Sequence, residues 1–201
     1  NFRGVISIND SFVTNNYAVG ISPDGMGAGI YSTGNGGSAS LMIQNSTISL
    51  NSASRQGGGI FNADNSTLSI SSSTISGNTS NANGGGVYNY RNSTLTISSS
   101  TVSGNISNSG GGISNRESTL SLINSTITNN QAIGGGFYGV GGGIYSEGNG
   151  GSPIFVLIEN STVSFNSASR NGGGIFNKNH SNLTILSSSI VGNTANDYAG
   201  G

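Results

Sequence analysis

The stretch Gly84–Asn105, GGGVYNYRNSTLTISSSTVSGN, decides the fold, because close copies of it recur along the whole chain. Residues 57–78 read GGGIFNADNSTLSISSSTISGN, which has the same length and the same order of residue types. An Asn closes this motif seven times, at Asn16, Asn51, Asn78, Asn105, Asn130, Asn166 and Asn193. A unit repeated every 25 to 36 residues predicts a solenoid, in which like residues of successive turns stack on one another.

Each repeat contains three segments with the pattern of a short β-strand. The first follows a run of glycines, as Val87 does in the quoted stretch. The second alternates apolar and polar residues, as at Leu95 and Ile97, which is typical of a strand with one buried face. The third holds an Ile or Val three residues before the closing Asn, such as Val102.

The backbone is expected to bend between the second and third segments. Their inward residues are five positions apart, as Ile97 and Val102 are, and an odd offset interrupts the alternation of a strand. The residues at the bend are of types that form tight turns: Asp10, Asn45, Ser72, Ser99, Asn124, Asn160 and Ser187. Three strands and three bends per repeat predict an all-β fold, one parallel β-helix domain over residues 1–201 with about seven coils.

The repeated positions also predict what stabilises the coils. Inward Ile, Leu and Val should form apolar columns, and each buried side chain should contribute about 1.5–3 kcal/mol. The seven closing asparagines are expected to form a structural ladder of amide hydrogen bonds from coil to coil. The glycines before the first segment are expected to have positive φ, or to lie where a Cβ would clash with the next coil.

A longer period overlies the short one. Residues 27–38 return as 141–152 and residues 51–55 return as 166–170, so that residues 16–86 are copied as 130–201. The chain holds nearly a whole number of coils with matching registers. We therefore expect head-to-tail stacking on copies of itself, or continuation into a longer array.

The composition excludes several classes of function. Six Lys and Arg against seven Asp and Glu, a net charge of −1, form no basic stripe for nucleic acid. No apolar run approaches the ~20 residues that a membrane span needs, so membrane insertion is not expected. The chain has no Cys, which removes disulfides and thiolate metal sites.

The charged residues do not predict a catalytic site. Glycoside hydrolysis needs two carboxyl groups within ~5–9.5 Å of each other, and no two acidic residues share a column on neighbouring coils. His180, the single histidine, is expected on a solvated turn. We expect no enzymatic activity, no cofactor and no metal. The charges that cluster after the first segment are interpreted as avoidance of like-charge contacts: Asp64, Arg91, Arg116, Glu117, Glu147 and Lys178.

The run from Gly58-Gly59-Ile60 through Leu-x-Ile to a Ser-Thr-Ile-Ser-x-Asn motif resembles the repeats of bacterial polymorphic outer-membrane proteins and of adhesin and autotransporter passenger domains. Phe12-Val13-Thr14-Asn15-Asn16 comes closest to the Phe-x-x-Asn of those families, whereas most repeats here have Thr in place of Phe. The resemblance covers nearly the whole chain. It implies a right-handed β-helix and a place outside the cell or on its surface.

Five aromatic residues form a candidate contact stripe: Tyr31, Phe61, Tyr88, Tyr145 and Phe176. Each follows an inward Ile or Val and should therefore point outward, with Ser114 as the one gap. The rings are interpreted either as a stacked ladder that stabilises the sheet or as a contact surface for a glycan or a neighbouring rod.

We predict an extracellular structural protein, a rigid β-helical rod with itself as its partner. The alternative is a glycan- or host-binding adhesin module that uses the aromatic stripe. Ice binding through outward threonines is a third hypothesis and a weaker one, because they are expected to form a single column: Thr47, Thr74, Thr101, Thr126 and Thr162.

Overall fold

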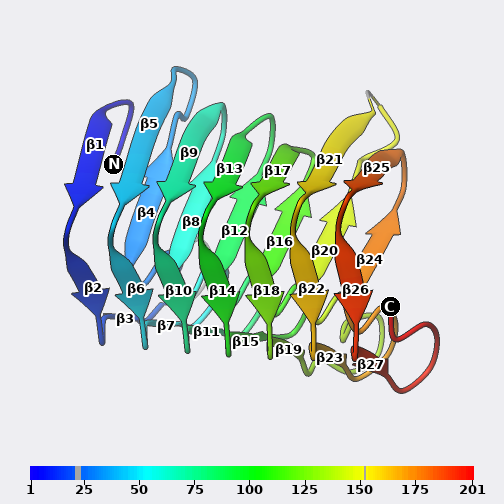
Figure 1. Ribbon diagram of the computed structural model, residues 1–201. Helices are drawn as coiled ribbons and strands as arrows, with labels where there is room; N and C mark the ends of the chain where they lie inside the picture. Colours follow the sequence, from blue (N-terminus) through cyan, green and yellow to red (C-terminus); the bar gives the residue numbers. More distant parts are fainter. Residues whose placement is uncertain (21–23, 152) are drawn as a thin grey trace.

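The structure is a computed structural model that describes residues 1–20, 24–151 and 153–201. Within these residues the chain forms 27 short strands and no helix. The strands pair into four sheets, and every pairing between strands of successive turns is parallel. Figure 1 shows that the chain winds in a right-handed sense along a straight axis, with the first and second sheets in front and the fourth behind. The fold is a parallel β-solenoid.

The first sheet contains β1 (Val5–Asn9), β5 (Ala39–Gln44), β9 (Ser66–Ser71), β13 (Thr94–Ser98), β17 (Thr119–Ile123), β21 (Ile154–Glu159) and β25 (Ser181–Leu186). The second contains β2 (Phe12–Thr14), β6 (Thr47–Ser49), β10 (Thr74–Ser76), β14 (Thr101–Ser103), β18 (Thr126–Thr128), β22 (Thr162–Ser164) and β26 (Ser189–Val191). The third contains β3 (Tyr17–Ala18), β7 (Ser52–Ala53), β11 (Thr79–Ser80), β15 (Ile106–Ser107), β19 (Gln131–Ala132), β23 (Ser167–Ala168) and β27 (Thr194–Ala195). The fourth contains β4 (Ile30–Thr33), β8 (Ile60–Ala63), β12 (Val87–Tyr90), β16 (Ile113–Arg116), β20 (Ile144–Glu147) and β24 (Ile175–Lys178).

One turn of the solenoid therefore runs through all four sheets, from β1 to β4 in turn 1 and from β21 to β24 in turn 6. The described residues make six such turns, and β25, β26 and β27 begin a seventh. The three strands expected per coil are present. The structure adds the third sheet, whose two-residue strands follow the closing asparagines and are too short to show an alternating pattern.

The apolar core is one continuous cluster along the axis. It contains the inward residues of the first, second and fourth sheets, and Leu95, Ile97, Val102 and Ile113 are fully buried in it. Between the first two sheets the chain bends at the seven predicted residues, whose φ angles of 46° to 49° lie in the left-handed region. Asn, Asp and Ser tolerate this conformation better than bulkier residues do.

Glycine runs allow the turns to approach closely before each strand of the fourth sheet. Gly84 has a φ of 68°, and a Cβ added to Gly86 would lie 2.6 Å from the carbonyl oxygen of Gly112 in the next turn. Both expected reasons for glycine, positive φ and lack of space, therefore apply within a single run.

Candidate functional site

The seven closing asparagines form a continuous hydrogen-bonded ladder. The Nδ2 of Asn105 donates to the Oδ1 of Asn130 at 2.9 Å and to the carbonyl of Ile75 at 3.0 Å. Its Oδ1 accepts hydrogen bonds from the backbone N–H and the Nδ2 of Asn78, at 2.9 and 3.0 Å. The same pattern joins Asn16 to Asn51 at one end and Asn166 to Asn193 at the other. Each inner amide thus has all its donors and acceptors paired inside the protein.

A second ladder consists of serines that the motif analysis did not single out. They directly follow the bend residues: Ser11, Ser46, Ser73, Ser100, Ser125, Ser161 and Ser188. The Oγ of Ser100 accepts the backbone N–H of Ser73 at 3.0 Å and donates to the carbonyl of Ser98 at 2.7 Å. The bend is therefore held by the side chain of the residue after the predicted one. The Ser at each of these seven positions was the sequence signal that could have identified this ladder.

The aromatic stripe lies on the outer face of the fourth sheet, but most of its rings are buried. Tyr31 and Phe61 stack with centroids 4.9 Å apart, and Phe61 and Tyr88 lie 5.5 Å apart. Phe61, Tyr88 and Tyr145 are only 3–6% exposed, because rings from neighbouring turns and side chains such as Met26 cover them. The expectation that the rings point away from the core is correct, whereas a continuous exposed stripe is not what the structure shows.

The gap in the stripe at Ser114 is the most polar part of this outer face. Ser114 pairs with Tyr88 on one side and with Tyr145 on the other. Two residues further along these strands, the Nε of Arg116 donates to a carboxylate oxygen of Glu147 at 2.9 Å.

Glu147 has three further partners at this corner. Lys178, from turn 6, lies 3.0 Å from the other carboxylate oxygen, and the Nδ2 of Asn179 donates to that oxygen at 3.1 Å. The hydroxyl of Tyr145 donates to the oxygen that Arg116 binds. Arg91 and Asp64 form a more exposed pair at 3.3 Å, one position further along the chain, after β12 and β8. The charges that the sequence analysis interpreted as avoidance of like-charge contacts thus include ion pairs between turns.

Burial and hydrogen bonding shift the pKa values of this cluster. Burial raises the pKa of Tyr88 to about 12. Burial, with the neighbouring Glu147 carboxylate, also raises the pKa of Tyr145. For Glu147, burial alone would raise the pKa, but hydrogen bonds from Tyr145 and Lys178 and the charge of Arg116 outweigh it and lower the pKa. The carboxylate is therefore ionised, and the phenols neutral, at physiological pH.

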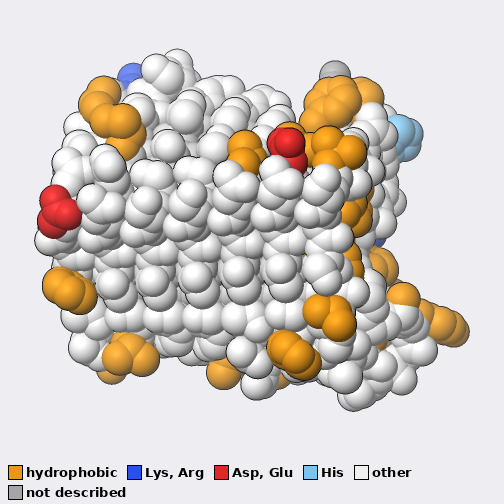
Figure 2. Space-filling model, in the orientation of Figure 1, with side chains coloured by type: hydrophobic (Ala, Val, Ile, Leu, Met, Phe, Trp, Pro, Cys, Tyr) orange, Lys and Arg blue, Asp and Glu red, His pale blue; other side chains and the backbone are white. Residues whose placement is uncertain are grey.

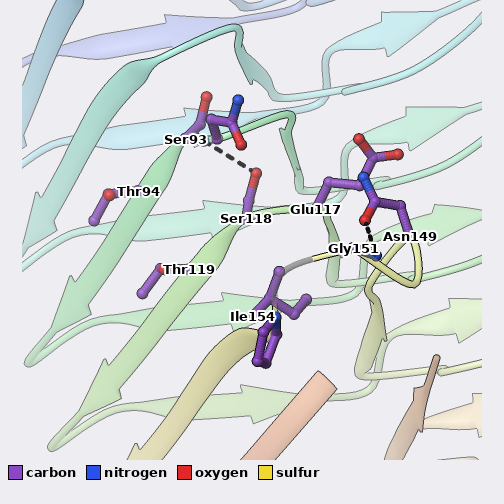
Figure 3. A pocket seen from close by; sticks show the side chains of 10 residues that line it. Ser93, Thr94, Glu117, Ser118, Thr119, Asn149, Gly151 and Ile154 are labelled. Atoms are coloured by element: carbon purple, nitrogen blue, oxygen red, sulfur yellow. Dashed lines mark hydrogen bonds between the residues drawn. The ribbon is translucent and has the colours of Figure 1, made fainter. Parts of the chain in front are cut away.

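Hollows surround this charged cluster. One of about 310 Å³ lies where the loop between β20 and β21 overhangs the start of β13 and β17. Figure 3 shows Glu117 beside Asn149 at its rim, and Ser118 pointing toward the backbone of Ser93, which donates to its Oγ at 3.2 Å. A second hollow, of about 240 Å³, lies on the other side of Arg116, under the loop between β19 and β20.

The structure brings few groups together that could perform chemistry. No group of three His, Cys, Asp or Glu side chains is placed to hold a metal ion within the described ranges. His180 is exposed, as expected of a turn residue, and it lines a hollow with Arg116, Glu117 and Glu147. In the part of the chain that the structure describes, no helix has the length and apolar character to cross a membrane.

The outer face of the second sheet is more regular than expected. The threonine column pairs from turn to turn, as Thr74 does with Thr101. A second column of hydroxyls runs beside it and corrects the single-column expectation: Ser49, Ser76, Ser103, Thr128 and Ser164. Figure 2 shows that this lower part of the front face is polar and carries no charge between its two ends.

The two ends of the solenoid differ from its middle. Ile6, Ile8 and Val13 in turn 1 are only partly buried, and Ile185 in β25 is 42% exposed. The matching residues of the inner turns are covered on both sides, as Ile158 is, with none of its surface exposed. The ends therefore present the apolar core to their surroundings.

Comparison with known proteins adds no family to this description. No family model matches the chain, and neither the curated proteins nor the solved structures give a match. What the findings establish is a parallel β-solenoid of about six turns.

Proposed function

We propose that the protein is an extracellular structural element, a rigid rod whose turns are extended end to end. The extension comes from further copies of the chain or from further turns of the same polypeptide in a surface array. The resemblance of the repeats to polymorphic outer-membrane proteins and adhesin passenger domains supports a place at the cell surface. The alternative, an adhesin that uses the whole aromatic stripe, is less well supported because three of its five rings are buried.

The observation that carries the proposal is the complementarity of the two end faces. At the C-terminal face, the backbone N–H of Asn193 and one N–H of its side chain have no acceptor among the described residues, nor does the backbone N–H of Ser188. In every inner turn the acceptors for these donors are the Asn Oδ1 and Ser Oγ of the next turn.

The N-terminal face carries the matching acceptors. The Oδ1 of Asn16 and the Oγ of Ser11 receive no hydrogen bond within the described residues, because β1, β2 and β3 are edge strands. A second copy stacked in register would pair both ladders and bury the exposed isoleucines. Each Ile buried in this way stabilises the contact by about 1.5–3 kcal/mol, and open strand edges favour such pairing.

Electron microscopy of the concentrated protein tests this proposal. Stacked copies should give filaments with an axial repeat of about 34 Å, which is seven strand spacings. The Ile185→Asp variant should remove the filaments, because a charge would be buried at each junction. Leu186→Asp is the matched control, since Leu186 is 48% exposed on the outer face of the same strand. Short discrete rods from the unaltered chain would contradict the stacking of copies. In that case, the mass of the natural polypeptide would test whether further turns of the same polypeptide extend the rod.

A further inference from the structure

The hollow of about 240 Å³ beside Arg116 has the properties of a small binding site. It lies on the outer side of the fourth sheet and is bounded by the loop between β19 and β20. Tyr138 and Tyr145 contribute aromatic rings to its wall, and Arg116 and Lys178 contribute positive charges. Arg116 comes from β16, Tyr145 and Glu147 come from β20, and Lys178 comes from β24, so three neighbouring turns contribute to the lining.

Polar groups at this cavity have unused hydrogen-bonding capacity. Ser109, which lines the cavity, is 2% exposed, and its Oγ has no hydrogen-bond partner among the described residues. Arg116 has five N–H donors; the one on Nε donates to Glu147, and the Tyr88 hydroxyl is a second hydrogen-bonding neighbour of the guanidinium, so donors remain for a ligand. A buried hydroxyl without a partner is costly, so these groups indicate a missing ligand.

The charge of the cavity selects the kind of ligand. Arg116 and Lys178 carry two positive charges, and Glu147, which lies between them, carries one negative charge. The three charged side chains that line the cavity thus sum to one positive charge, beside a wall of aromatic rings. A guanidinium with free N–H groups binds carboxylates with good geometry, and an aromatic ring packs against the apolar face of a ring-shaped ligand.

We propose that this cavity binds one carboxylated sugar residue, of the uronic acid class, within an acidic polysaccharide. The carboxylate is held by Arg116 and Lys178, the sugar ring lies against Tyr138, and a sugar hydroxyl reaches Ser109. Its volume is below the ~300–1,000 Å³ of typical small-molecule sites, so it accepts a single ring. This inference goes beyond the proposed rod, which requires no ligand.

The sequence copy of this region in turn 1 lacks the same groups. Residues 114 positions earlier place Thr33 where turn 5 has Glu147, and Asp24 where it has Tyr138. The hollow at that place is lined by Asp24, Met26 and Tyr31 and carries no cation. We therefore expect one site per chain, in turn 5.

Isothermal titration calorimetry with tetragalacturonate, and with maltotetraose as an uncharged probe of equal length, tests the proposal. Tetragalacturonate should bind saturably with one site per chain, more tightly than maltotetraose, and more weakly as salt is added. Arg116→Gln should weaken binding about 10- to 100-fold, the range that follows from losing a hydrogen bond to a charged group. Arg91→Gln is the matched control and should leave binding unchanged, because Arg91 is also an ion-paired arginine of this corner but does not line the cavity.

A second variant distinguishes a loss of binding from an effect of the Arg116 substitution on folding. Tyr138 is 55% exposed on the loop, so Tyr138→Asp, which installs the residue of turn 1, should keep the thermal unfolding curve and weaken binding by a similar factor. Absence of saturable binding, equal binding of the two oligosaccharides, or full binding by both variants would overturn the assignment.

Discussion

The loops that precede β4 in turn 1 and β20 in turn 5 are copies of each other in sequence, yet they build different surfaces. Their anchors are the same. Ser54 Oγ donates to the carbonyl of Gly20 at 2.8 Å, and Ser169 Oγ donates to that of Gly134 at 2.6 Å. Gly25 and Gly139 are equivalent and both have a φ of 78°. At these described positions the two loops therefore have the same anchor and the same glycine conformation.

The surfaces differ because the two loops have different neighbours. Tyr31 is 37% exposed and lies on β4, the edge strand of the fourth sheet, whereas Tyr145 is 6% exposed between β16 and β24. Thr33 accordingly has a single charged partner, Asp64 at 3.1 Å, while Glu147 meets charges from both adjacent turns. The repeated sequence determines the backbone of a turn. The adjacent turns determine how exposed its outward side chains are and which partners they have.

The largest expected contrast between the copies concerns their ladder residues. Asn130 is fully buried and its side chain makes four hydrogen bonds, so Asn130→Ala leaves several buried partners unsatisfied. We expect a loss of about 3 kcal/mol in the free energy of unfolding, against about 1 kcal/mol for Asn16→Ala at the open end. Denaturant unfolding measures both values, and equal losses would show that the ends of the ladder are as well paired as its middle.

Removing the two tyrosine rings should give a smaller contrast in the same direction. Tyr145→Ala is expected to cost about 3 kcal/mol, the lower end of the range for buried aromatic residues, and Tyr31→Ala about half as much because its ring is partly exposed. Chemical denaturation of the two variants checks this. A larger loss for Tyr31 would mean that edge stacking on Phe61 matters more than burial.

The charge at Glu147 should make stability depend on pH. Its pKa is lowered in the folded protein, so its contribution is present above the ordinary Glu pKa of about 4.3 and is lost as the pH falls below that value. Glu147→Thr, which copies turn 1, should cost about 1 kcal/mol at pH 7 and remove this part of the acid dependence. Thermal unfolding between pH 7 and pH 3 measures it, with Glu159→Thr as the surface control. An unchanged pH profile would exclude a role for the ion pairs.

The smallest effect should be the same for both copies. Ser54→Ala and Ser169→Ala each remove one loop anchor, and each should lower the free energy of unfolding by about 1 kcal/mol or less. Limited proteolysis should cut both loops faster in these variants. A loss confined to one loop would show that the second copy is held by other contacts.

Much of the fold could be predicted because each turn repeats the same short patterns. The alternation at Leu95 and Ile97 located a strand, and the odd offset to Val102 located the bend before it. The third sheet could not be predicted in this way, since a two-residue strand such as β15 has no period. The serine ladder was within reach of the sequence, because Ser100 has a Ser counterpart in every turn.

The candidate site was less predictable. The charges at Arg116 and Glu147 were recognised as one corner and interpreted as avoidance of like-charge contacts, which did not predict the ion pair between them. The burial of Phe61 and Tyr88 was not foreseen, because it depends on rings from adjacent turns closing over each other at the ~4.8 Å strand spacing. The cavity beside Arg116 depends on how a glycine-rich loop folds back on the sheet, which its local sequence does not specify.

The sequence by itself determined the solenoid, its register and its ladders, because every inward position repeats and like residues can only pair when the turns stack in order. Only the tertiary structure decided which outward residues are covered, which charges meet, and where hollows remain. The physical reason is that inward positions carry the same kind of residue in every turn, whereas outward positions vary from turn to turn and are also covered by loops of different length. Beside Arg116, the loop between β19 and β20 covers the sheet and leaves one such hollow.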